Sequence, residues 1–188
     1  TREVTELKHV VTDMHESSGQ TVEALRAEVK SFRAKLAVTQ QIAHTDALTN
    51  VSNRRAGEQA LRDLIEQRGT FCILVFDMDR FKGINDRWGH QAGDAVLVEF
   101  SRRLAAAVRT GDSVFRWGGD EFVAILPNCK LTQATERASQ INSACKGQYT
   151  FTANGEKVSL FVQASLGMAQ YLPGDSVVTF AEEIAAAD

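Results

Sequence analysis

The sequence predicts an α+β fold, an α/β sandwich preceded by a long helix, and three observations lead to this fold class. Residues 1–43 contain no proline and carry apolar residues at helical spacing. From residue 54 onward, segments with helical apolar spacing alternate with short apolar runs typical of strands. Asn154-Gly155 separates two strand-like segments, and this dipeptide favours a two-residue hairpin. Helices and strands that alternate around one sheet, with a hairpin among them, predict a layered sandwich.

Residues 1–43 are expected to form one amphipathic helix with a narrow apolar seam. The seam consists of two sets with alternating three- and four-residue steps: Val4, Leu7, Val11 and Met14, then Val22, Leu25, Val29, Phe32 and Leu36. The sets are out of phase, and Ser18 bridges them by two steps of four, a stutter that locally unwinds a coiled coil. Such a seam favours a parallel coiled coil with a second copy, which would act as a signalling and dimerisation helix. The alternative is a helix that packs on the chain's own globular domain.

Residues 44–188 are expected to form the globular domain. Its helices are predicted over residues 54–67, 92–108, 132–145 and 180–187. Its strands are predicted over residues 71–76, 113–117, 121–126, 149–153 and 157–170. The run 71–76 is apolar without interruption, as expected for a strand that is buried on both faces.

The composition excludes several classes of protein. Hydrophobic residues make up 44% and charged residues 24% of the 188 residues, which indicates an ordered globular chain. A net charge of -3 gives no basic field for a nucleic acid polymer, so an anionic nucleotide would need local cations or a metal. Three dispersed cysteines suit reduced thiols in a cytosol, and no apolar run approaches the ~20 residues that span a bilayer. Because the first residue is Thr1, we expect the chain to be part of a longer protein, with removal of an initial methionine as the alternative.

Two groups of carboxylates follow or precede predicted strands. Asp77 and Asp79 come directly after the buried run 71–76, and Asp120-Glu121 follows Gly118-Gly119 in a predicted turn. Ligand sites in open sheets often lie at strand ends, and unpaired buried carboxylates are costly. One such pair is weak evidence, since acids after strands are common. Two groups together favour a Mg²⁺ site, because this ion takes oxygen ligands from one or two carboxylates, phosphates and water.

Four motifs in this chain resemble one known family in order and spacing. They are Asp-x-Leu-Thr at 46–49 with Asn53-Arg54-Arg55, Asp-x-Asp-x-Phe-Lys at 77–82 with Ile84-Asn85-Asp86, Gly-His-x-x-Gly-Asp at 89–94, and Arg116-Trp117-Gly118-Gly119-Asp120-Glu121-Phe122. The chain resembles the GGDEF family of diguanylate cyclases over about residues 44–188. The resemblance implies a fold similar to the palm of adenylyl cyclases and polymerases, with a central, largely antiparallel sheet flanked by helices.

The resemblance implies a role for each matching residue in the metal and phosphate site. Asp77, the backbone carbonyl of Met78, Asp120 and Glu121 would hold Mg²⁺, with Mn²⁺ as an alternative and a two-metal site as an option. Asp120 would also be the base that takes the proton of the 3′-hydroxyl. Lys82 and the backbone N–H groups around Phe81 would hold the phosphates and stabilise the transition state.

The same resemblance implies the substrate-binding and product-binding positions. Asn85 and Asp94 would read guanine, and His90, Gly118 and Gly119 lie among the substrate-binding positions. His90 is nearly as well explained as a helix cap. Asp79 and Asp86 match the motifs without a definite role, and Asp86 also fits a cap. Arg109 and Asp112, as Arg-x-x-Asp nine residues before Gly118, would form the allosteric site for the product.

Two departures from the family pattern are present. Asn50-Val51-Ser52 replaces a Gly-Leu-Pro-like step, which changes a turn, since Asn tolerates positive φ. The family pattern continues past the position of Asp188 with an Ala-Leu-Tyr-x-Ala-Lys helix whose basic end grips phosphates.

The resemblance implies a bacterial, cytoplasmic enzyme, with a membrane tether left open for the full-length protein. It would be a Mg²⁺-dependent, dimeric diguanylate cyclase that condenses two GTP into cyclic di-GMP and two pyrophosphates, with product feedback inhibition. A second hypothesis is a catalytically impaired regulatory module that binds GTP or cyclic di-GMP. A third is a dimerising signal relay without chemistry, which explains residues 1–43 but leaves both acid groups without a function.

Overall fold

The computed structural model describes residues 25–26, 28–32, 35, 44–153 and 155–175, which fall in two units, residues 1–43 and 44–188. The described residues of the first unit are helical. Three of its seam residues, Leu25, Val29 and Phe32, are 48–63% exposed in the single chain. The stutter at Ser18 and the helix predicted over residues 180–187 lie outside the described residues.

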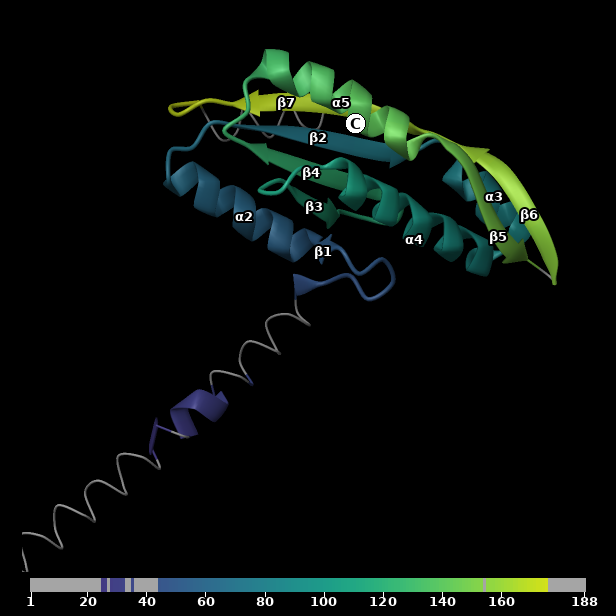
Figure 1. Cartoon of the computed structure of the whole chain (residues 1–188), viewed down its shortest axis with the longest axis horizontal. Coiled ribbons are helices and arrows are strands. Elements are labelled where there is room, and N and C mark those ends of the chain that lie inside the picture. Colours follow the sequence, from purple (N-terminus) through teal and green to yellow (C-terminus); the bar gives the residue numbers. More distant parts are fainter. Residues whose placement is uncertain (1–24, 27, 33–34, 36–43, 154, 176–188) are drawn as a thin grey trace, which may run out of the picture. The chain divides into compact units, whose positions relative to one another are not determined.

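A five-stranded sheet forms the centre of the second unit. Its strand order is β1 (Ser52–Asn53), β3 (Ser113–Arg116), β4 (Glu121–Pro127), β2 (Phe71–Met78) and β7 (Ala164–Tyr171). Every pairing is antiparallel except that of β1 with β3. The predicted central, largely antiparallel sheet is therefore confirmed. A separate hairpin of β5 (Gly147–Ala153) and β6 (Glu156–Val162) extends beyond the end of the sheet at which β2 finishes (Figure 1).

Helices cover both faces of this sheet because β2 is apolar on both of its faces. Residues Cys72, Leu74 and Phe76 face α4 (His90–Ala107) and α5 (Leu131–Cys145). The alternate residues Phe71, Ile73 and Val75 face α2 (Arg54–Glu66). The short helix α3 (Phe81–Trp88) follows β2 directly and lies beside the β5–β6 hairpin (Figure 1). In the described part of the chain, no helix combines the length and apolar character needed to cross a bilayer.

Several predicted elements differ from the observed ones. The single strand predicted over residues 157–170 is wrong, because the chain leaves the hairpin at Val162 and enters the central sheet at Ala164. Gln163 stands between the two sheets, and its carbonyl accepts a hydrogen bond from the backbone N–H of Asp79 (3.1 Å). The helix α3 is not among the predicted elements, β2 extends two residues further than predicted, and α4 begins two residues earlier.

The predicted two-residue hairpin between β5 and β6 is confirmed by its register. Ala153 pairs with Glu156, which leaves two residues in the loop. Gly155 has a φ of 82°, as a type I′ turn requires, and Asn154 lies outside the described residues.

Candidate active site

The carboxyl end of β2 and the start of β4 bring two carboxylates side by side. Asp77 is directly opposite Glu121 in the antiparallel β2–β4 register, and Ser165 of β7 is opposite Asp77 on the other side. Side chains that are directly opposite in neighbouring strands project from the same face of a sheet, with Cβ atoms about 5 Å apart. Ser165, Asp77 and Glu121 therefore form a row across three strands, on the sheet face that α2 covers further along.

The turn before β4 is held close to this row by backbone hydrogen bonds. The N–H of Trp117 donates to the carbonyl of Glu121 (2.9 Å), and the N–H of Met78 donates to the carbonyl of Asp120 (3.4 Å). A Cβ on Gly118 would lie 2.7 Å from Oε2 of Glu121, so the missing side chain makes room for this carboxylate. Asp120 is half-buried beside the end of β2. The turn therefore places Asp120 and Glu121 together at the end of β2.

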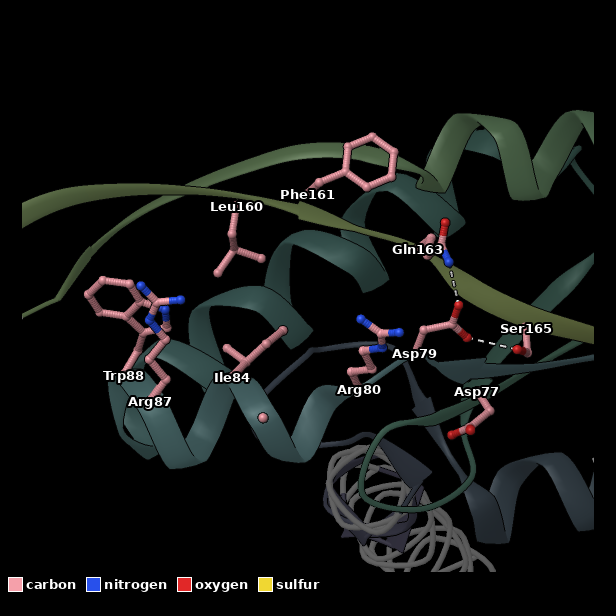
Figure 2. A pocket seen from close by; sticks show the side chains of 11 residues that line it. Asp77, Asp79, Arg80, Ile84, Arg87, Trp88, Leu160, Phe161, Gln163 and Ser165 are labelled. Atoms are coloured by element: carbon pink, nitrogen blue, oxygen red, sulfur yellow. Dashed lines mark hydrogen bonds between the residues drawn. The ribbon is translucent and has the colours of Figure 1, made fainter.

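Asp79 has a structural role that the sequence motif did not predict, because its carboxylate accepts hydrogen bonds from residues near β7. Its two carboxylate oxygens accept hydrogen bonds from Nε2 of Gln163 (2.6 Å) and Oγ of Ser165 (2.7 Å), as Figure 2 shows. The hydrogen bond from Ser165 lowers the pKa of Asp79, partial burial opposes this, and the Gln163 hydrogen bond and the charge of Arg80 add to the lowering. Asp79 thus ties the end of β2 to the junction between β6 and β7.

Asp46, like Asp79, is a carboxylate with a structural role, and it lies on the other side of the site. Its Oδ1 accepts from Nη1 of Arg116 (3.0 Å) and from the N–H (2.9 Å) and hydroxyl (2.6 Å) of Thr49. Arg116 also donates through Nε (3.2 Å) and Nη2 (2.8 Å) to the carbonyl of Gly119. Burial raises the pKa of Asp46, but the hydrogen bonds from Thr49 and Arg116 outweigh it and hold that pKa below its usual value of 3.8. One arginine therefore connects the segment that enters the domain to the Gly118-Gly119 turn.

The positions predicted to read guanine lie on α3 and α4. Asn85 is half-buried and packs against the first turn of α4, where a Cβ on Gly93 would lie 2.0 Å from its Oδ1. Asp94 is exposed on α4 one residue after this contact, and Lys82 and His90 are exposed on the first turns of α3 and α4. The missing side chain of Gly93 lets Asn85 lie between the two helices.

The carboxylate row suits a magnesium ion that also binds phosphate. Among residues 44–153 and 155–175 and the few described before them, no three His, Cys, Asp or Glu side chains converge as a complete metal site. Mg²⁺ does not need such a cage, because it keeps several waters and commonly binds one or two carboxylates together with substrate phosphates. Asp77 and Glu121 supply two carboxylates on one sheet face, which fits this ion.

A cleft of about 850 Å³ opens beside Asp77 and contains Asp79. One wall is a face of α3, and the other is formed by the end of β6 and the start of β7 (Figure 2). Its lining includes two cations and two aromatic side chains, Arg80, Arg87, Trp88 and Phe161. The cleft therefore offers both positive charge and apolar surface next to the carboxylate row.

A second hollow, of about 420 Å³, contains Arg109 and Asp112 at the start of β3. Oδ2 of Asp112 accepts from the backbone N–H of Arg109 (2.8 Å) and forms an ion pair with Nη2 of Arg137 on α5. The Asp112 and Arg137 side chains are only 6% and 12% exposed. Because Ser113 pairs with Ile125 near the end of β4, this hollow lies at the opposite end of β3 from the Gly118-Gly119 turn.

Comparison with known proteins gives the family of this domain. A family model described as "Diguanylate cyclase, GGDEF domain" matches residues 43–188. The chain belongs to the GGDEF family. Diguanylate cyclase TpbB of Pseudomonas aeruginosa is 44% identical to this GGDEF chain over 162 residues, which cover 81% of the chain and 37% of TpbB. Protein YhcK of Bacillus subtilis, which is described as uncharacterized, is 40% identical over 134 residues, with 69% of this chain and 37% of YhcK covered.

Solved GGDEF structures share this fold. Diguanylate cyclase SiaD of P. aeruginosa, crystallised with its activator SiaC, superposes with a TM-score of 0.77 at 25% identity, covering 99% of this chain and 72% of SiaD. The coiled coil and GGDEF domain of Caulobacter crescentus DgcB, in complex with c-di-GMP, gives a TM-score of 0.71 at 29% identity, covering 91% and 92% of the two chains. The predicted fold class is thereby confirmed. The chain spans little more than a third of the length of TpbB and YhcK.

In this GGDEF domain, the predicted site residues fall at two places. The structure brings Asp77, Met78, Asp120 and Glu121 together at the ends of β2 and β4, and α3 and α4 follow with the predicted substrate-binding positions. Arg109 and Asp112 form a separate hollow. The motifs did not predict the hydrogen bonds of Asp79 or the contact of Asp46 with Arg116. They also did not predict the ion pair of Arg137 with Asp112. Asp46 and Arg116 both lie inside the matched motifs, which was the available signal, whereas nothing in the sequence singled out Arg137.

The Asp46–Arg116 contact gives a prediction for stability. Arg116→Ala should lower the free energy of unfolding of this GGDEF chain by about 1–3 kcal/mol, because the half-buried carboxylate of Asp46 loses its cationic partner and the Gly119 carbonyl loses its arginine donor. Chemical denaturation of the full chain measures this change. Arg102→Ala, which breaks the exposed pair of Arg102 with Glu99, should cost less than about 1 kcal/mol.

The same contact predicts a dependence on pH. A lowered pKa contributes stability above the ordinary value of 3.8, and this stability is lost as pH falls through the lower folded value. The stability difference between wild type and Arg116→Ala should therefore narrow in acid, below about pH 4. A difference that stays constant or grows in acid would contradict the assigned role of Asp46.

Proposed function

We propose that this domain is a diguanylate cyclase that condenses two GTP molecules into cyclic di-GMP and two pyrophosphates, as a Mg²⁺-dependent dimer. The observation that carries the proposal is the Asp77–Glu121 pair at adjacent strand ends, with the half-buried Asp120 beside it. Membership of the GGDEF family and the similarity to diguanylate cyclase TpbB support the reaction class.

The chemistry can be assigned to the chain's own residues. In each of two displacements, the 3′-oxygen of one nucleotide forms a bond to the α-phosphorus of the other, and the bond from that phosphorus to the pyrophosphate oxygen breaks. Asp120 accepts the proton of the 3′-hydroxyl, which requires hydrogen-bond reach to that group. Lys82 and the backbone N–H groups at the start of α3 hold the phosphates, where a helix N-terminus favours negative charge. Mg²⁺ held by Asp77, the Met78 carbonyl, Asp120 and Glu121 would neutralise charge on the phosphates.

Selection of guanine is assigned to Asn85 and Asp94. A carboxylate accepts hydrogen bonds from the N1–H and amino group of guanine, and adenine does not offer this pair of donors. Asn85 is held in place between α3 and α4 by its contact with Gly93. The two side chains come from consecutive helices, so a base that enters between them meets both.

A second copy of the chain is needed because each domain is expected to hold one GTP. The exposed seam residues Leu25, Val29 and Phe32 support pairing through the N-terminal helix. Such a tether raises the effective concentration of the two domains, which short flexible linkers already bring to the ~mM range. The solved DgcB structure contains a coiled coil and a GGDEF domain, which also supports this arrangement.

The alternative function is a regulatory module that binds GTP or cyclic di-GMP without turnover. It would retain the Arg109–Asp112 hollow and have no need for three acids at the ends of β2 and β4. The presence of Asp77, Asp120 and Glu121 therefore favours the enzyme.

Removing Asp120 tests the enzyme directly. Asp120→Ala should lower the rate of cyclic di-GMP formation from GTP and Mg²⁺ by at least about 100-fold, because it removes the proton acceptor. Chromatography with mass spectrometry measures the product. Asp63→Ala on the exposed face of α2 is the matched control and should retain the wild-type rate. A near wild-type rate for Asp120→Ala, or equal conversion of ATP and GTP, would refute the proposal.

Product feedback is proposed at the Arg109–Asp112 hollow. The crystal structure of DgcB with c-di-GMP supports product binding in this family. Arg109→Ala should weaken cyclic di-GMP binding, measured by calorimetry, about tenfold or more, because it removes a charge-assisted contact. The inhibitory concentration of the product should rise by the same factor. Equal product affinity in wild type and Arg109→Ala would show that the product binds elsewhere.

A further inference from the structure

Arg80 lines the 850 Å³ cleft and has an unusual backbone conformation. It stands between the end of β2 and the first residue of α3, with φ 60° and ψ 27°, a left-handed conformation that few residues other than glycine adopt. Its side chain lines the cleft together with Asp77 and Asp79. Figure 2 shows its guanidinium beside Asp79, on the side of the cleft nearest to Asp77.

The guanidinium of Arg80 is available for an anion. In the part of the chain that the structure describes, its side chain makes no hydrogen bond or ion pair. Its acidic neighbour Asp79 already accepts from Gln163 and Ser165, one donor on each oxygen. Arg80 therefore acts on Asp79 through its charge, which helps to lower the pKa of Asp79, and its hydrogen-bond donors remain available.

Arg87 provides an internal comparison. It lies on the same face of α3 and lines the same cleft, seven residues further on, which is about 10 Å along a helix. Its guanidinium lies over the ring of Trp88, 4.9 Å from the ring centre. Arg87 is therefore both further from Asp77 and already engaged.

We propose that Arg80 binds the β- or γ-phosphate of the nucleoside triphosphate, as a second phosphate-binding cation of the active site. This inference rests on the proposed function, because it assumes that Asp77 and Glu121 hold the α-phosphate through Mg²⁺. From there the triphosphate tail must pass the start of α3, and Arg80 is the lining cation of the cleft that precedes that helix. Lys82, the cation that the motif assigned to the phosphates, does not line this cleft. A guanidinium can hold two phosphate oxygens at once, which suits a β- or γ-phosphate.

The test compares nucleotides with and without the tail. The full chain is titrated with Mg²⁺ and either GMP or a GTP analogue with a methylene bridge between the α- and β-phosphorus, which prevents turnover. Arg80→Ala should weaken binding of the analogue about tenfold or more and change GMP binding less than about twofold. Arg80→Lys should recover part of the loss, because it keeps the charge but not the fork. Arg87→Ala should leave the ratio of the two affinities within about twofold of wild type.

Each other outcome overturns the inference. Equal losses for GMP and the analogue would mean that Arg80 only maintains the turn before α3, and equal effects of Arg80→Ala and Arg87→Ala would mean a general electrostatic effect. Unchanged affinities would mean no contact with the tail. The proposed function is tested separately by product formation. If the wild type makes no cyclic dinucleotide and Arg80→Ala still loses only the analogue, the triphosphate contact stands and the cyclase proposal fails.

Discussion

The antiparallel pairing of β2 with β4 is the constraint on which the candidate site depends. In this register Asp77 stands opposite Glu121, and the same ladder places Phe76 opposite Phe122. The side chains of both phenylalanines are fully buried, and the Phe100 ring of α4 packs against both of theirs. Because side chains alternate between faces, a slip of one residue would move these rings out of the core and the carboxylates to the opposite face. The burial of aromatic side chains on one face therefore fixes the position of the acids on the other.

Two hydrogen-bonded carboxylates lie on either side of the β2–β4 pairing and connect it to neighbouring segments. Asp46 is connected through Arg116 to the Gly119 carbonyl, on the side of β3 and β4. Asp79 is connected to Gln163 and Ser165, on the side of β7. Both carboxyl groups have lowered pKa values, because each is stabilised as an anion by its donors. Asp46 and Asp79 thus fix the two sides of the β2–β4 pairing, and the Asp77–Glu121 pair lies between them.

The sequence predicted the elements whose signals are local. The runs 71–76 and 121–126, the helices α2, α4 and α5 and the hairpin of β5 with β6 were all visible as apolar patterns or turn residues. The sequence did not predict that the chain passes from the hairpin to the central sheet at Gln163. The alternation of side chains along a strand is the same in either sheet. Contacts such as Asp46 with Arg116, 70 residues apart, and Asp112 with Arg137, 25 apart, depend on the completed fold and leave no local pattern.

The most direct measurement for the central claim is the position of a bound metal. Crystals of the chain grown with Mn²⁺ and a non-reacting GTP analogue would locate the ion by its anomalous scattering. The account predicts Mn²⁺ at the ends of β2 and β4, with oxygen ligands from Asp77 and Glu121 and from the phosphates. An ion bound elsewhere, or phosphates that lie away from these two carboxylates, would contradict it.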